Sequence, residues 1–471
     1  MNELLLASAT ELARRIRAGE LSSREVVEAH IAHVEAVNPT LNAVVADRFE
    51  QALEEAERPH EGPFAGVPCT IKECFALDGM PQTSGLPARV GFRPSDEATA
   101  VKRIRASGAI PLGVTNLSEL CMWMESDNRV YGRTSNPYDA SRMVGGSSGG
   151  EGAIVGSGAS PFGLGSDIGG SIRMPAFFCG VFGHKPTGGR VPGTGQHPIA
   201  HGSALRMLAT GPLCRRAEDL APLLQLLEGP DGHDGECRAM PWRDPATVDL
   251  TKLRVLDVHQ DGWAPVSREL RDKQAEVAKH LAGLGAEVEV RTFGKLKHSF
   301  DLWGAALDDA GGPTFRELMG DGDPIPRTLE LFKWAARRSD HTLPALLLAC
   351  IEEVPKVMTG RRLKMLQWAA ELQRDLEEAL GDDGVMLYPS HSRTAYKHLA
   401  PLATPFRFTY TAVINVLELP ATQVPLGLGA GGLPTGVQVV AARGNDHLCL
   451  AVALELERAF GGWVPPQATP Q

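Results

Sequence analysis

The sequence lacks several features that would place it in whole classes of protein. None of its 471 residues belongs to an apolar run near the about 18–20 residues of a membrane span. The first residues, Met1 to Ala7, show no basic segment followed by a long apolar one, so no signal peptide is expected. Lys plus Arg number 47 against 57 for Asp plus Glu, a net charge of −10 that offers nucleic acid no basic surface. We therefore expect a cytoplasmic protein with no membrane span and no nucleic-acid partner.

Paired cysteines are also missing. The eight cysteines are scattered and contain no CxxC pair: Cys69, Cys74, Cys121, Cys179, Cys214, Cys237, Cys350 and Cys449. This spacing favours reduced thiols over a disulfide framework or a zinc site.

Glycine is the residue present in excess. The chain has 51 glycines, about 11% of its residues against about 7% in an average protein. It has only 34 prolines and no G-X-Y period, which excludes a collagen-like or low-complexity chain.

Hydrophobic patterning predicts strands that alternate with helices. The expected strands are 41–46, 67–72, 110–115, 253–258, 286–290, 385–388, 421–425 and 436–442. Two helices are expected at the N-terminus, with Ser8 and Ser22 or Ser23 as N-caps and the second ending at Asn38-Pro39. Further helices are expected at 51–57, 97–107, 217–227, 267–284, 361–380 and 446–460. The alternation predicts an α/β fold with helices on both faces of the sheet. The segment 228–245 is a linker or a surface loop, and the loop is the favoured interpretation.

Glycines and serines concentrate between Gly145 and Gly180. A P-loop would need GxxxxGK followed by Ser or Thr, and the block contains none. A dinucleotide-binding GxGxxG is also disfavoured, because Ile168 stands where the third glycine belongs after Gly163 and Gly165.

Nucleophilic catalysis by a serine remains, with either a histidine or a lysine as its base. Gly145 to Gly149 formally matches GxSxG around Ser147, but 138–144 is a poor strand for a nucleophile elbow. Its base would be a downstream histidine, His391 or His447. The alternative base is a lysine, which must be neutral to act and which burial would help to neutralise. Lys72 ends an apolar strand and is the candidate.

Five motifs together resemble those of the amidase signature family. They are GGSSGG and GSDIGGSIR within 145–180, GHKPT at 183–187, GVPCTIKE at 66–73 and LPTGVQ at 433–438. The similarity runs from the N-terminal helices to the last helix, and the sequence of the motifs is most similar to that of the fatty-acid amide hydrolase branch. It implies one domain, 1–471, built on a large twisted mixed β-sheet. Its parts would be N-terminal helices (about 1–60), a catalytic core (about 61–230), a variable substrate-side region (about 231–400) and a C-terminal sheet and helix (about 401–471).

The resemblance also implies a catalytic triad. Ser171 would be the nucleophile, Ser147 the bridging serine after a cis peptide, and Lys72 the general base. The oxyanion hole would be made by backbone amides, those of Ile168, Gly169, Gly170 and Ser171. Ser148 would be a supporting hydroxyl at the substrate, whereas Asp167 and Arg173 would be structural. No metal and no cofactor would be needed.

Two apolar segments bear on the substrate. In the family, the strip Leu120 to Met124 borders the acyl pocket, so Cys121, Met122, Trp123 and Met124 are candidate substrate-binding residues. Ordinary core is an equal alternative. Residues 329–354 would be a cap over the pocket, a membrane-touching patch or, as favoured, buried helices.

The sequence therefore predicts a serine hydrolase that cleaves the C–N bond of small hydrophobic acyl or aryl amides. The alternative is the glutamine-hydrolysing subunit of a transamidation complex, which would need a polar pocket and a partner protein. The oligomeric state is left open, with a homodimer as one option.

Overall fold

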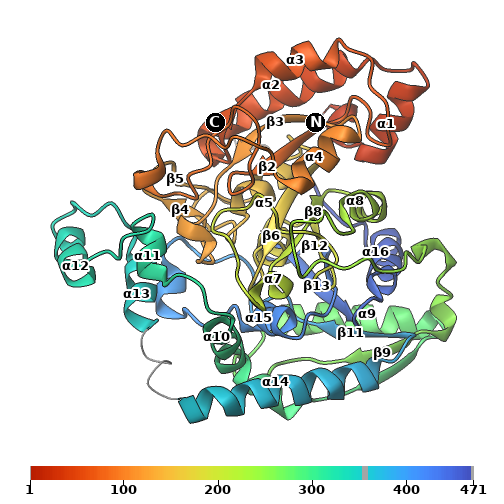
Figure 1. Cartoon of the computed structure of the whole chain (residues 1–471). Coiled ribbons are helices and arrows are strands. Elements are labelled where there is room, and N and C mark those ends of the chain that lie inside the picture. Colours follow the sequence, from red (N-terminus) through yellow and green to blue (C-terminus); the bar gives the residue numbers. More distant parts are fainter. Residues whose placement is uncertain (1, 353–358, 468–471) are drawn as a thin grey trace.

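The computed structural model describes residues 2–352 and 359–467. Its centre is a mixed sheet of eleven strands in the order β1-β3-β2-β6-β8-β7-β12-β13-β11-β9-β10 (Figure 1). The strands are β1 (Val44–Asp47), β2 (Pro68–Lys72), β3 (Ile110–Thr115), β6 (Phe162–Asp167), β7 (Phe182–Lys185), β8 (Ala209–Cys214), β9 (Arg254–Asp257), β10 (Glu287–Val290), β11 (Gly384–Tyr388), β12 (Ala421–Leu428) and β13 (Pro434–Ala441). A two-stranded ribbon, β4 (Asp127–Asn128) and β5 (Gly132–Arg133), stands apart. The chain is a single-domain α/β fold.

Helices surround the sheet. They are α1 (Ala9–Arg17), α2 (Ser23–Leu41), α3 (Phe49–Ala56), α4 (Thr99–Ala106), α5 (Gly149–Gly156), α6 (Arg173–Phe178), α7 (Ala204–Met207), α8 (Leu220–Leu227), α9 (Arg268–Leu284), α10 (Ser299–Ala310), α11 (Phe315–Met319), α12 (Arg327–Ala335), α13 (Leu343–Ile351), α14 (Thr359–Leu380), α15 (Thr409–Val416) and α16 (Asp446–Phe460). In Figure 1, α1 to α3 lie at one end of the sheet and α14 at the other.

Both faces of the sheet are buried, as the sequence predicts. Along β11, Val385 and Leu387 point into one core, with residues of α8, α9 and α16. Met386 and Tyr388 point into the opposite core, with residues of α6, α14 and α15. A strand buried on both faces reads as a continuous apolar run, which is why such segments could be recognised.

The N-terminal helices begin where their caps predict. The Ser8 hydroxyl accepts from the amide of Glu11, and Ser22 forms a capping box with Glu25. The predicted stop at Asn38-Pro39 is wrong, because α2 continues through Pro39 to Leu41. The first strand accordingly starts at Val44 and not at residue 41.

Three central strands, β6, β7 and β8, were not expected from the sequence. They contain Gly163, Gly165, Gly183 and Gly211, which interrupt the apolar pattern. The sites need glycine because neighbouring atoms fill the space of a side chain. A Cβ at Gly163 would lie 1.7 Å from the Glu151 carboxylate, and one at Gly211 would lie 2.2 Å from the His184 carbonyl oxygen. Because these glycines have no side chain, the apolar periodicity of the three strands is interrupted and could not be recognised from the sequence.

The remaining segments complete the outline. Residues 228–244 contain no helix or strand, as expected of a loop. Residues 299–351 fold into α10 to α13, and α12 lies far from the sheet in Figure 1. Within the described residues, no helix has both the length and the apolar character required to cross a bilayer.

Candidate active site

Lys72 and Ser147 form the centre of the site. Lys72 is the last residue of β2, which lies between β3 and β6. Its Nζ donates to the Ser147 Oγ at 2.7 Å and to the Ser166 Oγ at 2.9 Å. Lys72 and Ser147 are both fully buried. The predicted pair is thus brought into direct contact, although its members lie 75 residues apart in the sequence.

Ser147 is held between a tight turn and a helix. The Gly146–Ser147 peptide bond is cis, as the resemblance implies. A Cβ at Gly146 would lie 2.4 Å from the Trp123 carbonyl oxygen, so only glycine fits there. The Ser126 hydroxyl donates to the carbonyl oxygens of Gly145 and Ser147, both at 3.2 Å. These contacts tie the serine turn to the apolar strip that precedes Ser126.

Ser171 lies on the loop between β6 and α6. It is 7% exposed, whereas Ser147 is fully buried. Its carbonyl oxygen accepts from the Ser148 amide at 3.2 Å, which joins the two serine segments. Its hydroxyl makes no hydrogen bond to any described residue, so the Ser147–Ser171 link is not formed in this structure. Catalytic hydrogen bonds are often long in a free enzyme and tighten only when substrate is bound.

The carboxylate of Asp167 holds the Ser171 loop in place through hydrogen bonds and an ion pair. Its carboxylate accepts from the amides of Gly170 at 2.7 Å and Ile172 at 3.0 Å. It also pairs with the guanidinium of Arg173 at 3.0 Å. Burial opposes the charge of the carboxylate, but Arg173, Lys185 and the amide hydrogen bonds together outweigh burial and hold the pKa of Asp167 below its usual range. Asp167 and Arg173 therefore support the loop, which agrees with the structural role expected of them.

The four predicted oxyanion amides are not equivalent. The Gly170 amide is already used by Asp167. The amides of Ile168, Gly169 and Ser171 have no acceptor among the described residues. The Trp303 ring from α10 lies against this turn, with its Nε1 donating to the Ile168 carbonyl oxygen at 2.8 Å. Three of the four predicted amides are therefore free to donate.

The predicted apolar strip is divided between two environments. Cys121, Met122 and Trp123 are partly exposed, whereas Met124 is 3% exposed and belongs to the core. Ser148 is fully buried, and its hydroxyl bonds the Ser166 backbone at 3.3 and 3.4 Å. Three residues of the strip are thus partly exposed, whereas Met124 and Ser148 are buried.

Met122 connects the strip to the outer helices. It packs against a small apolar cluster that includes Phe315 of α11 and Leu346 of α13. In α12, by contrast, Leu329 and Phe332 are 51% and 71% exposed. Leu347 of α13 is likewise 42% exposed, whereas Leu331 and Trp334 of α12 pack against the same cluster. The favoured prediction of buried helices therefore holds for only one side of each helix. Glu353 and Val354 lie outside the described residues.

Two buried carboxyls beside the site were not predicted. Glu151 accepts from Thr70 at 2.6 Å and Thr115 at 2.8 Å, and burial raises its pKa to about 8. Burial raises the pKa of Glu73, the residue after Lys72, to about 7. Glu73 ends the motif GVPCTIKE and Glu151 directly follows the motif GGSSGG, and that position was the only available signal. A glutamate within an apolar segment indicates that its carboxyl is buried, but the sequence does not show which residues bond to it.

The histidine alternative is not supported. His391 is fully buried between the rings of Phe178 and Tyr396. Burial lowers its pKa to about 3 and also lowers the pKa of His447. The hydroxyl of Ser147 meets Lys72 instead.

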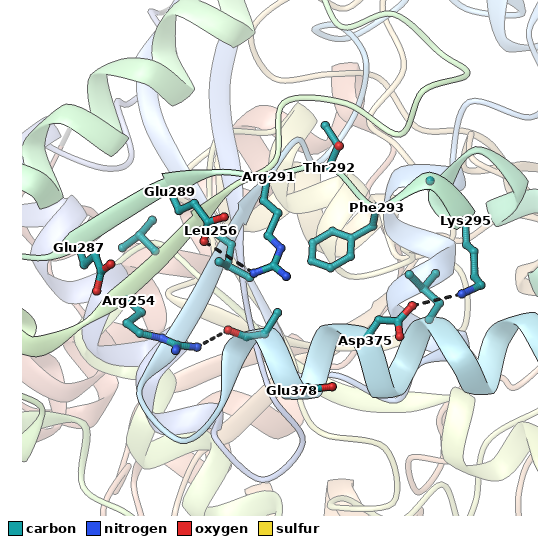
Figure 2. A pocket seen from close by; sticks show the side chains of 14 residues that line it. Arg254, Leu256, Glu287, Glu289, Arg291, Thr292, Phe293, Lys295, Asp375 and Glu378 are labelled. Carbon is teal, nitrogen blue, oxygen red and sulfur yellow. Dashed lines mark hydrogen bonds and ion pairs between the residues drawn. The ribbon is translucent and has the colours of Figure 1, made fainter.

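No group of three or more His, Cys, Asp or Glu side chains placed to hold a metal occurs among the described residues. A separate groove of about 740 Å³ lies at the other end of the sheet, between β9, β10 and α14 (Figure 2). Two of its cations pair with carboxylates of the groove, Lys295 with Asp375 and Arg291 with Glu289. It contains none of the predicted site residues, so it is no part of this site.

Comparison with known proteins defines the class. A family model described as Amidase matches residues 25–450. Fatty-acid amide hydrolase 2-A of Danio rerio is 48% identical, with 99% of this chain and 91% of that protein covered. The solved structure of a 6-aminohexanoate cyclic dimer hydrolase complexed with substrate has a TM-score of 0.84 and 29% identity, and it covers 98% of each chain. A glutamyl-tRNA(Gln) amidotransferase subunit of Synechococcus sp. (strain CC9605) is 31% identical, with 95% of each chain covered.

The chain therefore belongs to the amidase family and is an amide hydrolase that acts on C–N bonds. Among these relatives, the fatty-acid amide hydrolase is markedly more similar to it than the amidotransferase protein.

Proposed function

We propose that this enzyme hydrolyses hydrophobic acyl or aryl amides through an acyl-enzyme on a Lys72–Ser147–Ser171 triad. The observation that carries the proposal is the 2.7 Å contact between the Lys72 Nζ and the Ser147 Oγ, both fully buried. A serine needs an adjacent base to become a nucleophile, and this lysine is placed to act through the bridging serine.

The reaction would begin with proton transfer along the triad. Lys72, in its neutral form, takes the proton of Ser147 as Ser147 takes that of Ser171. The Ser171 Oγ attacks the amide carbonyl carbon, and the negative charge moves to the carbonyl oxygen. The proton then returns through Ser147 to the nitrogen of the leaving amine, and the C–N bond breaks. Water hydrolyses the ester to Ser171 by the same transfers.

The negative charge on the carbonyl oxygen would be stabilised by backbone donors. The amides of Ile168, Gly169 and Ser171 are free to donate. The Gly170 amide would contribute only if it broke its 2.7 Å hydrogen bond to the Asp167 Oδ1. Fixed donors of this kind are worth about 10²–10³-fold in rate each.

The proposed substrate class follows from the exposed part of the strip. Cys121, Met122 and Trp123 offer an apolar and adaptable wall, suited to a hydrocarbon or aromatic group. The name of the 48% identical relative, a fatty-acid amide hydrolase, points to the same class. Small polar glutamine would find little to bind on this wall.

A panel of p-nitroanilides with acyl chains of graded length tests the proposal. We expect kcat/KM to rise with chain length and glutamine to be a poor substrate. A preference for the shortest chains, together with glutaminase activity, would favour the alternative function in a transamidation complex. Gel filtration beside this assay would also determine the oligomeric state, for which a homodimer is one option, and cell fractionation would test the predicted cytoplasmic location.

A further inference from the structure

The turn before Ser171 has its carbonyl oxygens bonded and most of its amides free. It runs from Asp167, the last residue of β6, to Ser171. Four consecutive carbonyl oxygens each accept a hydrogen bond, those of Asp167, Ile168, Gly169 and Gly170. The amides of Ile168, Gly169 and Ser171 have no acceptor among the described residues. The turn is therefore held through its acceptors, which leaves three donors available.

Each of these carbonyl contacts also fixes the direction of an amide. A peptide unit is planar and, in this turn, trans, so its carbonyl oxygen and the amide of the next residue point in opposite directions. The Asp167 carbonyl oxygen accepts from the Asn415 Nδ2 at 2.7 Å. The Gly170 carbonyl oxygen accepts from the Met174 amide, also at 2.7 Å. These two contacts direct the first and the last of the three free amides.

The direction of the Gly169 amide depends on a side chain from a distant part of the sequence. The Ile168 carbonyl oxygen accepts from the Trp303 Nε1 at 2.8 Å, across 135 residues of sequence. The indole also lies against the turn, since a Cβ at Gly169 would be 3.4 Å from the Trp303 Nε1. The Trp303 ring packs edge-on against the ring of Phe408, with centroids 5.1 Å apart. This bond therefore turns the Gly169 amide away from the indole.

The next peptide unit is held from both sides. Its carbonyl oxygen, that of Gly169, accepts from the Thr411 Oγ1 at 2.8 Å. Its amide, that of Gly170, donates to the Asp167 carboxylate at 2.7 Å. The Ile168–Gly169 unit, by contrast, is held by the Trp303 indole alone, and its amide stays free. Loss of the indole donor would therefore release this unit, whereas its neighbour would stay in place.

We propose that Trp303 is a positioning residue for the oxyanion hole, in which its indole directs the Gly169 amide toward the carbonyl oxygen of the substrate. The inference deepens the proposed function and rests on it, because the negative charge forms only when Ser171 attacks the amide carbonyl. Donors stabilise such a charge best when they are already oriented before the reaction. Trp303 lies outside the five motifs, so the sequence carried no sign of this role.

Trp303→Phe tests the inference, because it removes the indole donor and keeps an aromatic ring beside the turn. One oxyanion donor is worth about 10²–10³-fold, so loss of its anchor should lower kcat by about 10–100-fold and leave KM nearly unchanged. An amide and an ester with the same acyl group should lose kcat/KM by the same factor, because both reactions form the oxyanion. A trifluoromethyl ketone with that acyl group should bind more weakly by a similar factor.

Trp463→Phe is the matched control. The Trp463 Nε1 also donates to a backbone carbonyl oxygen, that of Gly156 at 2.9 Å, at the last residue of α5. This variant loses the same kind of bond away from the Ser171 turn, so its kcat should stay at the wild-type value. Trp303→benzothienylalanine is a second test variant, because sulfur replaces only the N–H and the size of the ring is kept. It should show the same loss of kcat as Trp303→Phe, and urea unfolding confirms that each variant is folded.

Other outcomes separate the inference from the proposed function. A raised KM with unchanged kcat in Trp303→Phe would make the indole a wall of the substrate pocket and would overturn the inference. A changed amide-to-ester ratio, or an equal loss of kcat in Trp463→Phe, would also overturn it. Wild-type kcat in Trp303→Phe, together with an inactive Ser171→Ala, would overturn the inference alone. Amide hydrolysis that survives in Ser171→Ala would overturn the proposed function and the inference together.

Discussion

The centre of the sheet and the outer helices are built on opposite principles. Around Lys72, the buried groups are polar and are held by short contacts, such as those from Lys72 to Ser147 and Ser166. In α12, Leu329 and Phe332 are large and apolar and are more than half exposed. A reacting geometry tolerates little movement, so its groups must be fixed. The exposed side chains of α12 are under no such constraint. We therefore expect substitutions around Lys72 to change activity or stability strongly and substitutions at exposed positions of α12 to change little.

The largest effect is expected from Ser171→Ala. It removes the proposed nucleophile, so amide hydrolysis should fall roughly 10⁴-fold or more and fluorophosphonate labelling should disappear. Steady-state kinetics and intact mass check both results. Ser135→Ala, a partly exposed serine outside the site, is the control and should label normally. Labelling of Ser171→Ala at the wild-type rate would contradict the assignment of Ser171 as the nucleophile.

The second expectation concerns Lys72→Ala, compared on an amide and an ester with the same acyl group. Both reactions lose the base, but only the amide also loses the acid that protonates its leaving nitrogen. The amide-to-ester ratio of kcat/KM should fall by about 10²–10⁴-fold. Lys185→Ala is the matched control, because Lys185 is also buried and also ends a strand but donates to the Pro186 carbonyl oxygen. An unchanged ratio in Lys72→Ala would remove the proton-return step.

The third expectation is that Asp167→Asn lowers the free energy of unfolding. Arg173 is fully buried and would lose its charged partner, which typically costs about 3–5 kcal/mol. Urea unfolding measures the change. The same substitution at exposed Asp249 should stay within about 0.5 kcal/mol. Equal effects at the two positions would contradict the role of Asp167 in holding the Ser171 loop.

Glu151→Gln tests the buried carboxyl through pH. Burial raises the pKa of Glu151 from 4.5 to about 8, so the folded state keeps a proton that the unfolded chain releases. This stabilisation is complete below pH 4.5 and is lost as the pH rises through about 8. The unfolding free energy of Glu151→Gln relative to wild type should therefore rise by about 2–4 kcal/mol from pH 5 to pH 8. Parallel pH curves would contradict the raised pKa, and exposed Glu54→Gln is the control.

The smallest effect on stability is expected at the exposed side of α12. Phe332→Ser should change the free energy of unfolding by less than about 0.5 kcal/mol, because its side chain is already 71% exposed. Leu346→Ala, at a fully buried position of α13, should cost about 2–5 kcal/mol. Thermal unfolding of both variants checks the contrast. A large loss in Phe332→Ser would show that α12 packs against something that this structure does not contain.

Much of the fold could be predicted, but unevenly. The strands at β2, β3 and β11 to β13 were located because both of their faces are apolar. The extension of α2 through Pro39 was missed, because a proline in the last turn loses only one hydrogen bond. The strands β6 to β8 were missed because close neighbours replace the side chains that a periodicity would show. The strip was predicted as one unit, whereas packing places Met124 in the core and leaves Cys121, Met122 and Trp123 partly exposed.

The sequence by itself determined which residue types are available for the chemistry: a lysine at the end of an apolar strand and serines among glycines that permit close approach. It could not determine which of these groups touch, because contact between Lys72 and Ser147 depends on how β2 and α5 pack together. Tertiary structure alone decided that the Gly170 amide is used by Asp167 and that Glu151 is buried beside Thr70 and Thr115. The physical reason is the same in each case. Hydrogen bonds, burial and pKa values are set by distances of a few ångströms between residues far apart in the chain, and those distances exist only once the sheet and its helices have packed.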